Sequence, residues 1–280
     1  MIFKFIRDDA GELILDSAAW GLYDIEGLTG FPDVAVETQA YAFADGSYWT
    51  QNQAQKRHIA FKADYRYDDQ SYFMHNKVGS FFNHLADYEL FILSFDGKDG
   101  YIQGRVTDFI MPVQKSNDMV HFELAFLSVN PFIQSADDFG KNLNEVTPRI
   151  HYPRHYIVNQ KLPYSVRKYA QNVKITNEGG ISTGFVASVV FAEAASTFKL
   201  QNHRGQKIDI TKAFAAGDIL QIDTKNGVCR LNGTKFYKGI SNDSEFFVLY
   251  PGDNYLTYNA AIGESTLDLN VYYRSQRMVF

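Results

Sequence analysis

The chain has 280 residues, of which 45% are hydrophobic and 15% aromatic, so it can build two modest domains or one large one. The formal net charge of −5, with no long run of like charge, lacks the concentrated basic face that a nucleic-acid binder normally shows. No apolar run approaches the ~20 residues of a membrane span, and charge arrives too early at the N-terminus for a signal peptide. We therefore expect a soluble protein that is made in the cytoplasm, without nucleic acid as a partner.

The first half of the chain predicts strands and one helix. Residues 37–43 are a predicted strand followed by a turn at 44–46, and residues 57–65 alternate so that Ile59, Phe61, Ala63 and Tyr65 point inward. One apolar stripe has helical spacing, with Asn76 as the expected N-cap. The stripe consists of Val78, Phe81, Phe82 and Leu85.

Strands dominate the rest of the chain. Residues 88–95 and 101–110 form a predicted hairpin, and residues 120–129 a strand that Pro131 closes, because proline cannot donate to a ladder. Regular alternation stops between about 135 and 163, where prolines mark a connecting arm. Short strands then follow at the spacing of a β-sandwich, at residues 172–176, 185–192, 197–202, 207–211, 245–250, 255–261 and 267–274.

Residues 217–233 predict a further hairpin in this second half. A two-residue turn at Asn226-Gly227 pairs Ile222 with Leu231, Thr224 with Cys229, Gln221 with Asn232 and Asp223 with Arg230, which sorts apolar from polar faces. Cys229 is the single cysteine, so it cannot form an internal disulfide. We expect it to point inward as a small hydrophobic residue in a reducing environment.

Three motifs resemble sites of chemistry, and each fails a context test. Ser182 in Gly-Ile-Ser-Thr-Gly matches the hydrolase elbow, but a β-branched run follows where the elbow requires a helix, so we expect Ser182 to be dispensable. His151 and His155 have the i, i+4 spacing of metal ligands, but Pro153 disfavours the helix that would align them. Residues 96–100 resemble a calcium loop, yet Lys98 occupies a ligand position.

Other candidate groups also favour structural roles. The carboxylate pairs Asp8-Asp9, Asp68-Asp69 and Asp137-Asp138 lie beside turns and suggest no acid–base role. Trp20 and Trp49 could stack on sugar rings, but aromatic residues in a β-rich chain are mostly core. We therefore predict no catalytic, cofactor-binding or metal-binding residues and no enzymatic activity.

The order of several short motifs resembles a known family, the distal tail proteins of phages with long non-contractile tails. In the first half four features follow the family order. They are the turn at 45–46, residues 57–61, the short helix and Asn-Pro-Phe at 130–132. The second half carries most of the likeness. Its motifs are Asn-Glu-Gly-Gly at 177–180, Gly-Asp-Ile-Leu-Gln-Ile-Asp-Thr at 217–224, Asn-Gly at 226–227, Leu-Asn-Gly at 231–233, Phe-Phe-Val-Leu-Tyr-Pro-Gly-Asp-Asn at 246–254 and Tyr-Tyr-Arg at 272–274.

This resemblance implies a mainly β fold: an N-terminal ring-forming β-domain with one short helix at residues 1–135, an arm at 136–164, and a galectin-like β-sandwich at 165–280. It also implies a structural role without cofactors, in a phage or prophage of Gram-positive bacteria. Such proteins form a hexameric ring, a baseplate hub between the major tail (tube) protein and the tail-associated and receptor-binding or baseplate proteins. The chain would be assembled in the host bacterial cytoplasm and reside at the virion tail tip.

The resemblance also implies a role for each of the two domains. Residues 1–135 should carry self-association, and residues 165–280 alone should be a soluble monomer. The alternative function is a lectin, in which the C-terminal sandwich binds host cell-wall glycan. Fold likeness alone does not imply sugar binding.

Overall fold

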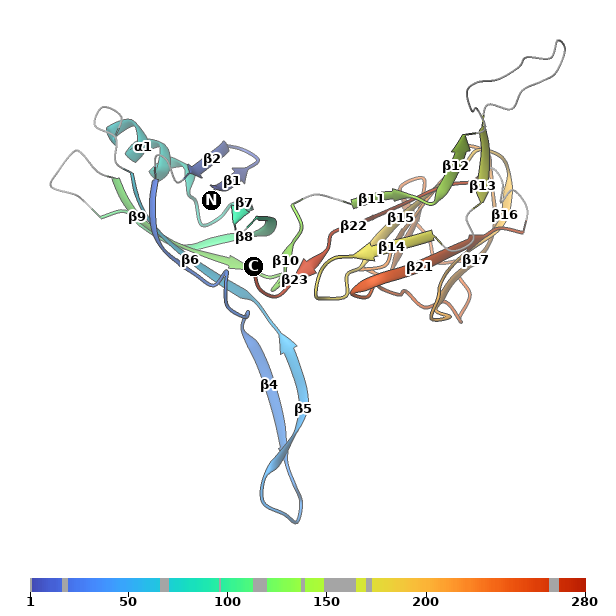
Figure 1. Cartoon of the computed structure of the whole chain (residues 1–280), viewed down its shortest axis with the longest axis horizontal. Coiled ribbons are helices and arrows are strands. Elements are labelled where there is room, and N and C mark those ends of the chain that lie inside the picture. Colours follow the sequence, from blue (N-terminus) through green and yellow to red (C-terminus); the bar gives the residue numbers. More distant parts are fainter. Residues whose placement is uncertain are drawn as a thin grey trace, which may run out of the picture. The chain divides into compact units, whose positions relative to one another are not determined.

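The computed structural model describes residues 2–16, 20–65, 71–95, 97–112, 120–136, 139–148, 165–169, 173–261 and 267–280. The chain divides into two compact units (Figure 1). Unit 1 consists of Met1–Ala136 together with Gln276–Phe280, and unit 2 of Asp137–Ser275. The mainly β fold class is confirmed, because strands dominate and the described part of the chain contains one short helix, α1 (Ser71–Phe81).

Unit 1 is organised around one antiparallel sheet with the strand order β2-β1-β7-β8-β9-β6-β3. Two short strands, β10 and β23, pair with each other beside this path, and β10 also pairs with β8. The strands are β1 (Ile2–Arg7), β2 (Gly11–Asp16), β3 (Trp20–Glu26), β6 (Arg57–Tyr65), β7 (Asp87–Phe95), β8 (Lys98–Ile110), β9 (Val120–Ser128), β10 (Ile133–Gln134) and β23 (Gln276–Arg277).

The sheet of unit 1 curls over an aromatic core. Phe3 and Phe5 of β1 contact Phe61 of β6 with ring centroids 5.0 and 5.7 Å apart, although three strands separate β1 from β6 in the sheet. Such contacts require the sheet to fold back on itself, so its two ends enclose the core. The predicted alternation of β6 is confirmed, with the four expected side chains buried.

The helix differs from its prediction at both ends. Val78, Phe81 and Phe82 are buried as expected, but α1 begins at Ser71, before Asn76, and ends at Phe81. Leu85 therefore lies outside the helix and is 73% exposed. The Asn83 side chain explains this end, since its Oδ1 accepts a hydrogen bond from the Leu85 amide at 2.9 Å and forms a turn that competes with helical bonding.

Unit 2 is a sandwich of two antiparallel sheets, with the orders β11-β22-β15-β18-β19-β20 and β14-β21-β16-β17. Phe191 of β15 stacks on Phe214 of β17 across the two sheets, with ring centroids 4.2 Å apart. Strands β12 and β13 form a separate two-stranded sheet. The bounds are β11 (Phe139–Asn142), β12 (Asn144–Pro148), β13 (Ser165–Tyr169), β14 (Val173–Asn177), β15 (Phe185–Phe191), β16 (Ala195–Asn202), β17 (Lys207–Phe214), β18 (Ile219–Asp223), β19 (Val228–Leu231), β20 (Thr234–Lys235), β21 (Gly252–Asn259) and β22 (Leu267–Tyr273).

Three segments are placed differently from the sequence predictions. Residues 245–250 were predicted as a strand but form only an isolated bridge from Leu249 to Thr183. Residues 139–142, assigned to the connecting arm, form β11, which pairs with β22 of the sandwich. Gln276–Phe280, assigned to the sandwich, belong to unit 1, because β23 pairs with β10 there. Arm residues 149–164 lie outside the described residues.

The hairpin of β18 and β19 exists, but its predicted register is wrong by two residues. Ile222 faces Cys229 and Asp223 faces Val228, so residues 224–227 form a four-residue loop. A shift of two preserves which side chains face the core, and Ile222 and Cys229 are both fully buried. Thr224 leaves the ladder because its hydroxyl donates to the Phe185 carbonyl at 3.0 Å and accepts from the Phe185 amide at 2.8 Å.

The tight two-residue turn lies one strand further on. Of the predicted pair Asn226-Gly227 only the glycine has a positive φ, 63°, whereas Asn232 and Gly233 both do, with 50° and 81°. Positive φ at both central residues is the requirement of the narrow hairpin turn, which here joins β19 to β20. Asp223 instead stabilises the wider loop by accepting hydrogen bonds from the Asn226 amide at 3.0 Å and from its side chain at 2.7 Å.

Arg57 joins segments of unit 1 that are far apart in sequence. Its side chain is 1% exposed, and its guanidinium donates to the carbonyl oxygens of Gly27, Gly30, Pro131 and Met278, with the bond to Pro131 at 2.8 Å. Burial lowers the pKa of this guanidinium. The bonds compensate the cost of removing the charge from water, so the four segments depend on one another.

We predict that Arg57→Met lowers the free energy of unfolding of unit 1 by about 3 kcal/mol, because it removes charge-assisted hydrogen bonds and leaves buried carbonyls without donors. Trp20, buried in the core of unit 1, reports its unfolding by fluorescence during urea denaturation. Arg105→Met is the matched control, since Arg105 pairs with Asp87 at the surface and its loss should change little. Equal stability of the two variants would contradict the role of Arg57.

We predict that Cys229 resists thiol reagents in the folded protein. Burial raises the pKa of the Cys229 thiol to about 11, so the reactive thiolate is scarce at neutral pH and the sulfur is also shielded. At pH 8 no thiol should react before denaturation, and one per chain should react in guanidinium chloride. Rapid labelling of the native protein would show that unit 2 does not bury this residue.

Candidate assembly surface

Among the described residues, the sequence motifs for chemistry are not assembled into a site. The chain continues from Ser182 through Thr183 and Gly184 directly into β15, so a strand stands where a hydrolase elbow needs a helix. Asp9 forms an ion pair with Arg7 at 2.6 Å, and Trp20 lies in the core of unit 1. Several other candidates lie outside the described residues, namely Asp68, Asp69, Asp96, Asp137, Asp138, His151 and His155.

The described residues contain neither a candidate metal site nor a candidate membrane-spanning helix. No group of three or more His, Cys, Asp and Glu side chains in that part of the chain could hold a metal ion. No helix there is long and apolar enough to cross a membrane. The feature that stands out is instead a surface of unit 1.

A long hairpin projects from the sheet of unit 1 (Figure 1). Its strands are β4 (Val34–Ala40) and β5 (Ser47–Ala54), and within the described part of the chain they pair only with each other. The predicted strand at 37–43 ends earlier, at Ala40, and the predicted turn is part of a longer tip in which the Tyr41 amide donates to the Gly46 carbonyl at 3.2 Å. Strand β5 was not predicted, although Tyr48, Trp49 and Thr50 are strong strand formers.

The two faces of the hairpin differ in polarity. The register pairs Val34 with Ala54, Val36 with Asn52 and, beyond a bulge, Thr38 with Trp49, which places Val34, Val36 and Trp49 on one face. The opposite face is polar, and Tyr48 on it donates to Gln39 Oε1 at 2.7 Å. We call the face of Val34, Val36 and Trp49 the apolar hairpin face.

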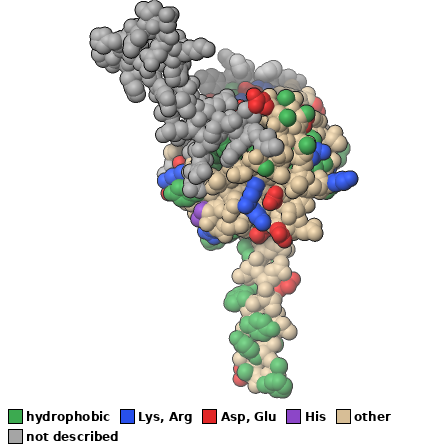
Figure 2. All heavy atoms as spheres, turned by 90° about the vertical axis from the view of Figure 1, so that its right-hand side faces the viewer, with side chains coloured by type: hydrophobic (Ala, Val, Ile, Leu, Met, Phe, Trp, Pro, Cys, Tyr) green, Lys and Arg blue, Asp and Glu red, His purple; other side chains and the backbone are tan. Residues whose placement is uncertain are grey.

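The apolar hairpin face is open to solvent. Val34 and Val36 are each 49% exposed and Trp49 is 69% exposed, while Tyr41 and Phe43 are exposed at the tip. Figure 2 shows hydrophobic side chains distributed along the projecting hairpin. A two-stranded hairpin without a third strand or a covering layer is at best marginally stable in water. An exposed apolar strip of this kind indicates an interaction surface.

The charge of the hairpin indicates which partner it suits. Residues 31–55 contain no Lys or Arg, and their charged side chains are Asp33, Glu37 and Asp45. Phosphate groups of nucleic acids or anionic lipids would be repelled. Aromatic residues with few charges are instead typical of the buried centre of a protein–protein interface. The hairpin therefore favours a protein partner.

The base of the hairpin is fixed to the main sheet. The Asp33 amide donates to the Lys56 carbonyl at 3.0 Å, and the Gln55 amide donates to the Asp33 carbonyl at 2.8 Å. Arg57 holds the loop that leads into β4 through the Gly27 and Gly30 carbonyls. The hairpin therefore extends the sheet at its β3–β6 edge. The loop that leads into β4 determines the direction in which the hairpin projects.

The edge strand β3 itself carries a polar cluster. His121 Nδ1 lies 2.6 Å from Asp64 Oδ1, and the Tyr23 ring stacks on the imidazole with centroids 5.9 Å apart. Burial and the nearby carboxylates of Asp64 and Glu123 raise the pKa of Tyr23. Because these residues come from β3, β6 and β9, the cluster ties the edge strand to its neighbours.

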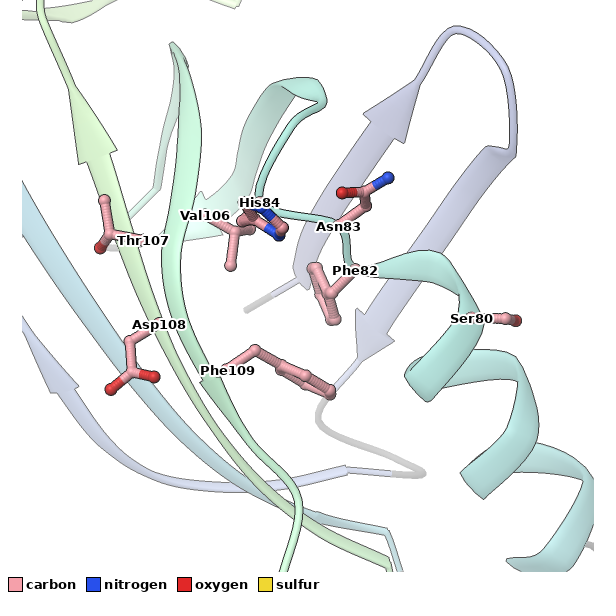
Figure 3. Close-up of a pocket in the computed structure, with 8 residues that line it drawn as sticks. All are labelled: Ser80, Phe82, Asn83, His84, Val106, Thr107, Asp108 and Phe109. Atoms are coloured by element: carbon pink, nitrogen blue, oxygen red, sulfur yellow. The ribbon is translucent and has the colours of Figure 1, made fainter.

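A second surface of unit 1 is concave. It is a pocket of about 540 Å³ between the end of α1 and a bulge in β8 (Figure 3). Phe82, Val106 and Phe109 give it an apolar lining, and polar side chains surround them. The polar residues are Ser80, Asn83, His84, Thr107 and Asp108. Exposed apolar side chains of Leu85 and Ile110 follow this lining in sequence.

The fold and the exposed apolar hairpin face define a class of protein: a β-rich chain of two units with a projecting hairpin that is suited to assembly. Residues 178–276 match the family model of the siphovirus-type tail component, C-terminal domain. The match lies almost entirely within unit 2, and the predicted resemblance to the distal tail proteins is confirmed. No curated protein matches the chain by sequence.

Solved structures extend the likeness to the whole chain. The crystal structure of the Dit protein of phage SPP1, described as a paradigm of the hub adsorption apparatus in phages that infect Gram-positive bacteria, covers 98% of both chains with a TM-score of 0.68 and 12% identity. At this identity the likeness concerns the fold. The baseplate of phage P2, in its activated conformations with Ca and with Sr, covers 97% of both chains with 10% identity and a TM-score of 0.46, too low to support an argument.

Proposed function

We propose that the chain is a structural protein of the siphophage tail tip, a distal tail protein that forms a hexameric ring. The ring would be the hub that joins the tail tube to the tail-associated and receptor-binding or baseplate proteins, in a phage or prophage of a Gram-positive host. Assembly in the bacterial cytoplasm precedes its place in the virion. The fold likeness to the SPP1 Dit protein supports this proposal over the full length of the chain.

The observation that carries the proposal is the uncovered apolar hairpin face of unit 1. A closed ring forms when one surface of a protomer meets a different surface of the next. A projecting hairpin with an apolar face suits one side of such a head-to-tail interface, since a neighbouring protomer would bury its side chains and protect its strand edges. Partners can strengthen weak self-association by mass action.

Electron microscopy tests the ring directly. The purified chain should form rings with six-fold symmetry at high concentration, or when mixed with a tail-associated protein of the same phage. Assembly would be concentration dependent, so dilute samples should contain monomers. Only monomers or two-fold dimers under both conditions would contradict the proposal.

Substitutions on the apolar hairpin face test whether it forms the contact between protomers. The double substitution Val36→Ser with Trp49→Ser should weaken self-association at least about 30-fold, because truncating a central aromatic residue of an interface costs about 2 kcal/mol or more. Both side chains are exposed in the monomer, so its stability should hardly change. Sedimentation velocity over a concentration series measures the effect.

The opposite face of the same hairpin supplies the control. Gln39→Ser with Gln53→Ser changes two side chains of the polar face and should leave self-association close to that of the unchanged chain. If both double variants assembled equally well, the apolar hairpin face would not be the contact. If both failed, the whole hairpin rather than one face would be responsible.

Unit 2 supports a second candidate function, glycan binding by the sandwich. The Arg204 guanidinium lies 3.7 Å from the Tyr250 ring centroid, and His203 contacts the exposed Tyr255 edge-on. Aromatic rings beside cationic and hydrogen-bonding groups suit sugar recognition. Binding of residues 137–275 to purified cell walls, lost on Tyr255→Ala with Arg204→Ala, would favour this function. Absence of binding would remove it.

A further inference from the structure

The last five residues of the chain complete unit 1. After unit 2 the chain returns as β23, where Gln276 pairs with Gln134 and Arg277 with Ile133 of β10. Phe280 packs against the core of unit 1, beside Gly100 of β8. A Cβ atom at Gly100 would lie 2.3 Å from a ring atom of Phe280, so the absence of a side chain there makes room for the C-terminal ring. Unit 2 is thus inserted between two strands that pair with each other.

This C-terminal segment also reaches the base of the hairpin. The Phe280 amide donates to the Leu28 carbonyl at 3.2 Å. Arg57 donates to the Met278 carbonyl with one nitrogen and to the Gly27 and Gly30 carbonyls with another. A single buried guanidinium therefore links the C-terminal segment to the loop that leads into β4. Figure 1 shows the C-terminus beside this loop, where the hairpin leaves the sheet.

We propose that Gln276–Phe280, acting through Arg57, position the hairpin, so that unit 1 becomes competent for self-assembly only when this segment is in place. This inference rests on the proposed role of the hairpin in assembly. Without the segment, Arg57 loses its Met278 acceptor, the Leu28 carbonyl loses its donor, and β10 loses its pairing with β23. The loop at residues 27–33 then keeps fewer of the bonds that fix the direction of β4 and β5.

The order of synthesis affects when the hairpin is fixed. Domains generally fold from the N-terminus as the chain emerges, and an apolar hairpin exposed early is prone to premature association. Here the segment that fixes the hairpin is made after unit 2. An unfinished chain therefore has the apolar hairpin face without the fixed geometry that a head-to-tail interface requires. It also follows that residues 1–135 alone lack part of unit 1, in contrast to our sequence-based expectation that they carry self-association by themselves.

Hydrogen exchange on the monomer tests the positioning itself. A chain that ends at Ser275 should exchange the amides of Asp33 and Gln55 about tenfold faster than the full chain, because local opening of the hairpin base becomes easier. The amides that join β1 to β7 should remain as protected as before, which shows that the sheet is folded. Equal exchange of Asp33 and Gln55 in the two chains would overturn the proposal.

A second variant keeps the test decisive if the shortened chain fails to fold. Gly100→Ala displaces Phe280 without changing the C-terminal segment, whereas Gly180→Ala in unit 2 meets open space and is the matched control. Gly100→Ala should accelerate exchange at Asp33 and Gln55, and Gly180→Ala should not. The same exchange in both variants would contradict the linkage.

Self-assembly supplies the functional readout. The chain ending at Ser275 should assemble at least about tenfold more weakly than the full chain, and a synthetic peptide of residues 275–280 added in excess should restore assembly by occupying the site beside β10. A merely destabilised fold would not be rescued in this way. If the shortened chain assembled as well as the full chain, the positioning role would be wrong while the ring proposal stood. If the full chain never assembled but the exchange difference appeared, the ring proposal would fail and the linkage would stand.

Discussion

A two-stranded ribbon cannot satisfy its own outer backbone groups or bury its own apolar side chains, and the β4–β5 hairpin is such a ribbon. Its register places Val34, Val36 and Trp49 on one face, where they are exposed to water. This arrangement is favourable only if another molecule buries that face. The absence of Lys and Arg over residues 31–55 makes a protein the suitable cover. The proposed ring would satisfy this constraint, because a neighbouring protomer would cover the apolar hairpin face.

A projecting hairpin is useful in an assembly only if its direction is reproducible, and that direction depends on buried polar bonds. Arg57 brings a charge into the core of unit 1, where it is tolerated because four carbonyl oxygens accept its hydrogen bonds. Those carbonyls come from the hairpin base, the end of β9 and the C-terminal segment. Because unit 2 is inserted between β10 and β23, the geometry of this hairpin depends on a segment that follows unit 2 in the chain.

Local patterns in the sequence predicted the parts of the fold that depend on local burial. The alternation of β6 and the inward direction of Ile222 and Cys229 are both confirmed, the latter despite a register error of two residues, since side-chain parity survives such a shift. The register itself depended on a distant partner: Thr224 bonds to Phe185, a contact that the hairpin sequence does not contain. Leu85 continued a helical stripe that the Asn83 turn interrupts.

The candidate assembly surface was harder to predict. The hairpin faces water on both sides in the monomer, so burial within one chain leaves no strong pattern, and β5 was missed. The role of Arg57 was not predicted, because its four acceptors are spread from Gly27 to Met278 and no local pattern brings them together. The resemblance to the distal tail proteins depended on the order of short motifs, and most of these motifs lie within residues 178–276, which match the family model.

The environment of Trp49 tests the central claim most directly. The chain has two tryptophans, so in a Trp20→Phe variant all tryptophan emission comes from Trp49, which is exposed in the monomer. Emission and acrylamide quenching should be followed across the concentration range in which sedimentation detects self-association. The account predicts that emission shifts to shorter wavelength and quenching falls as oligomers form, because a neighbouring protomer buries the indole. Oligomers that form while Trp49 stays fully quenchable would contradict it.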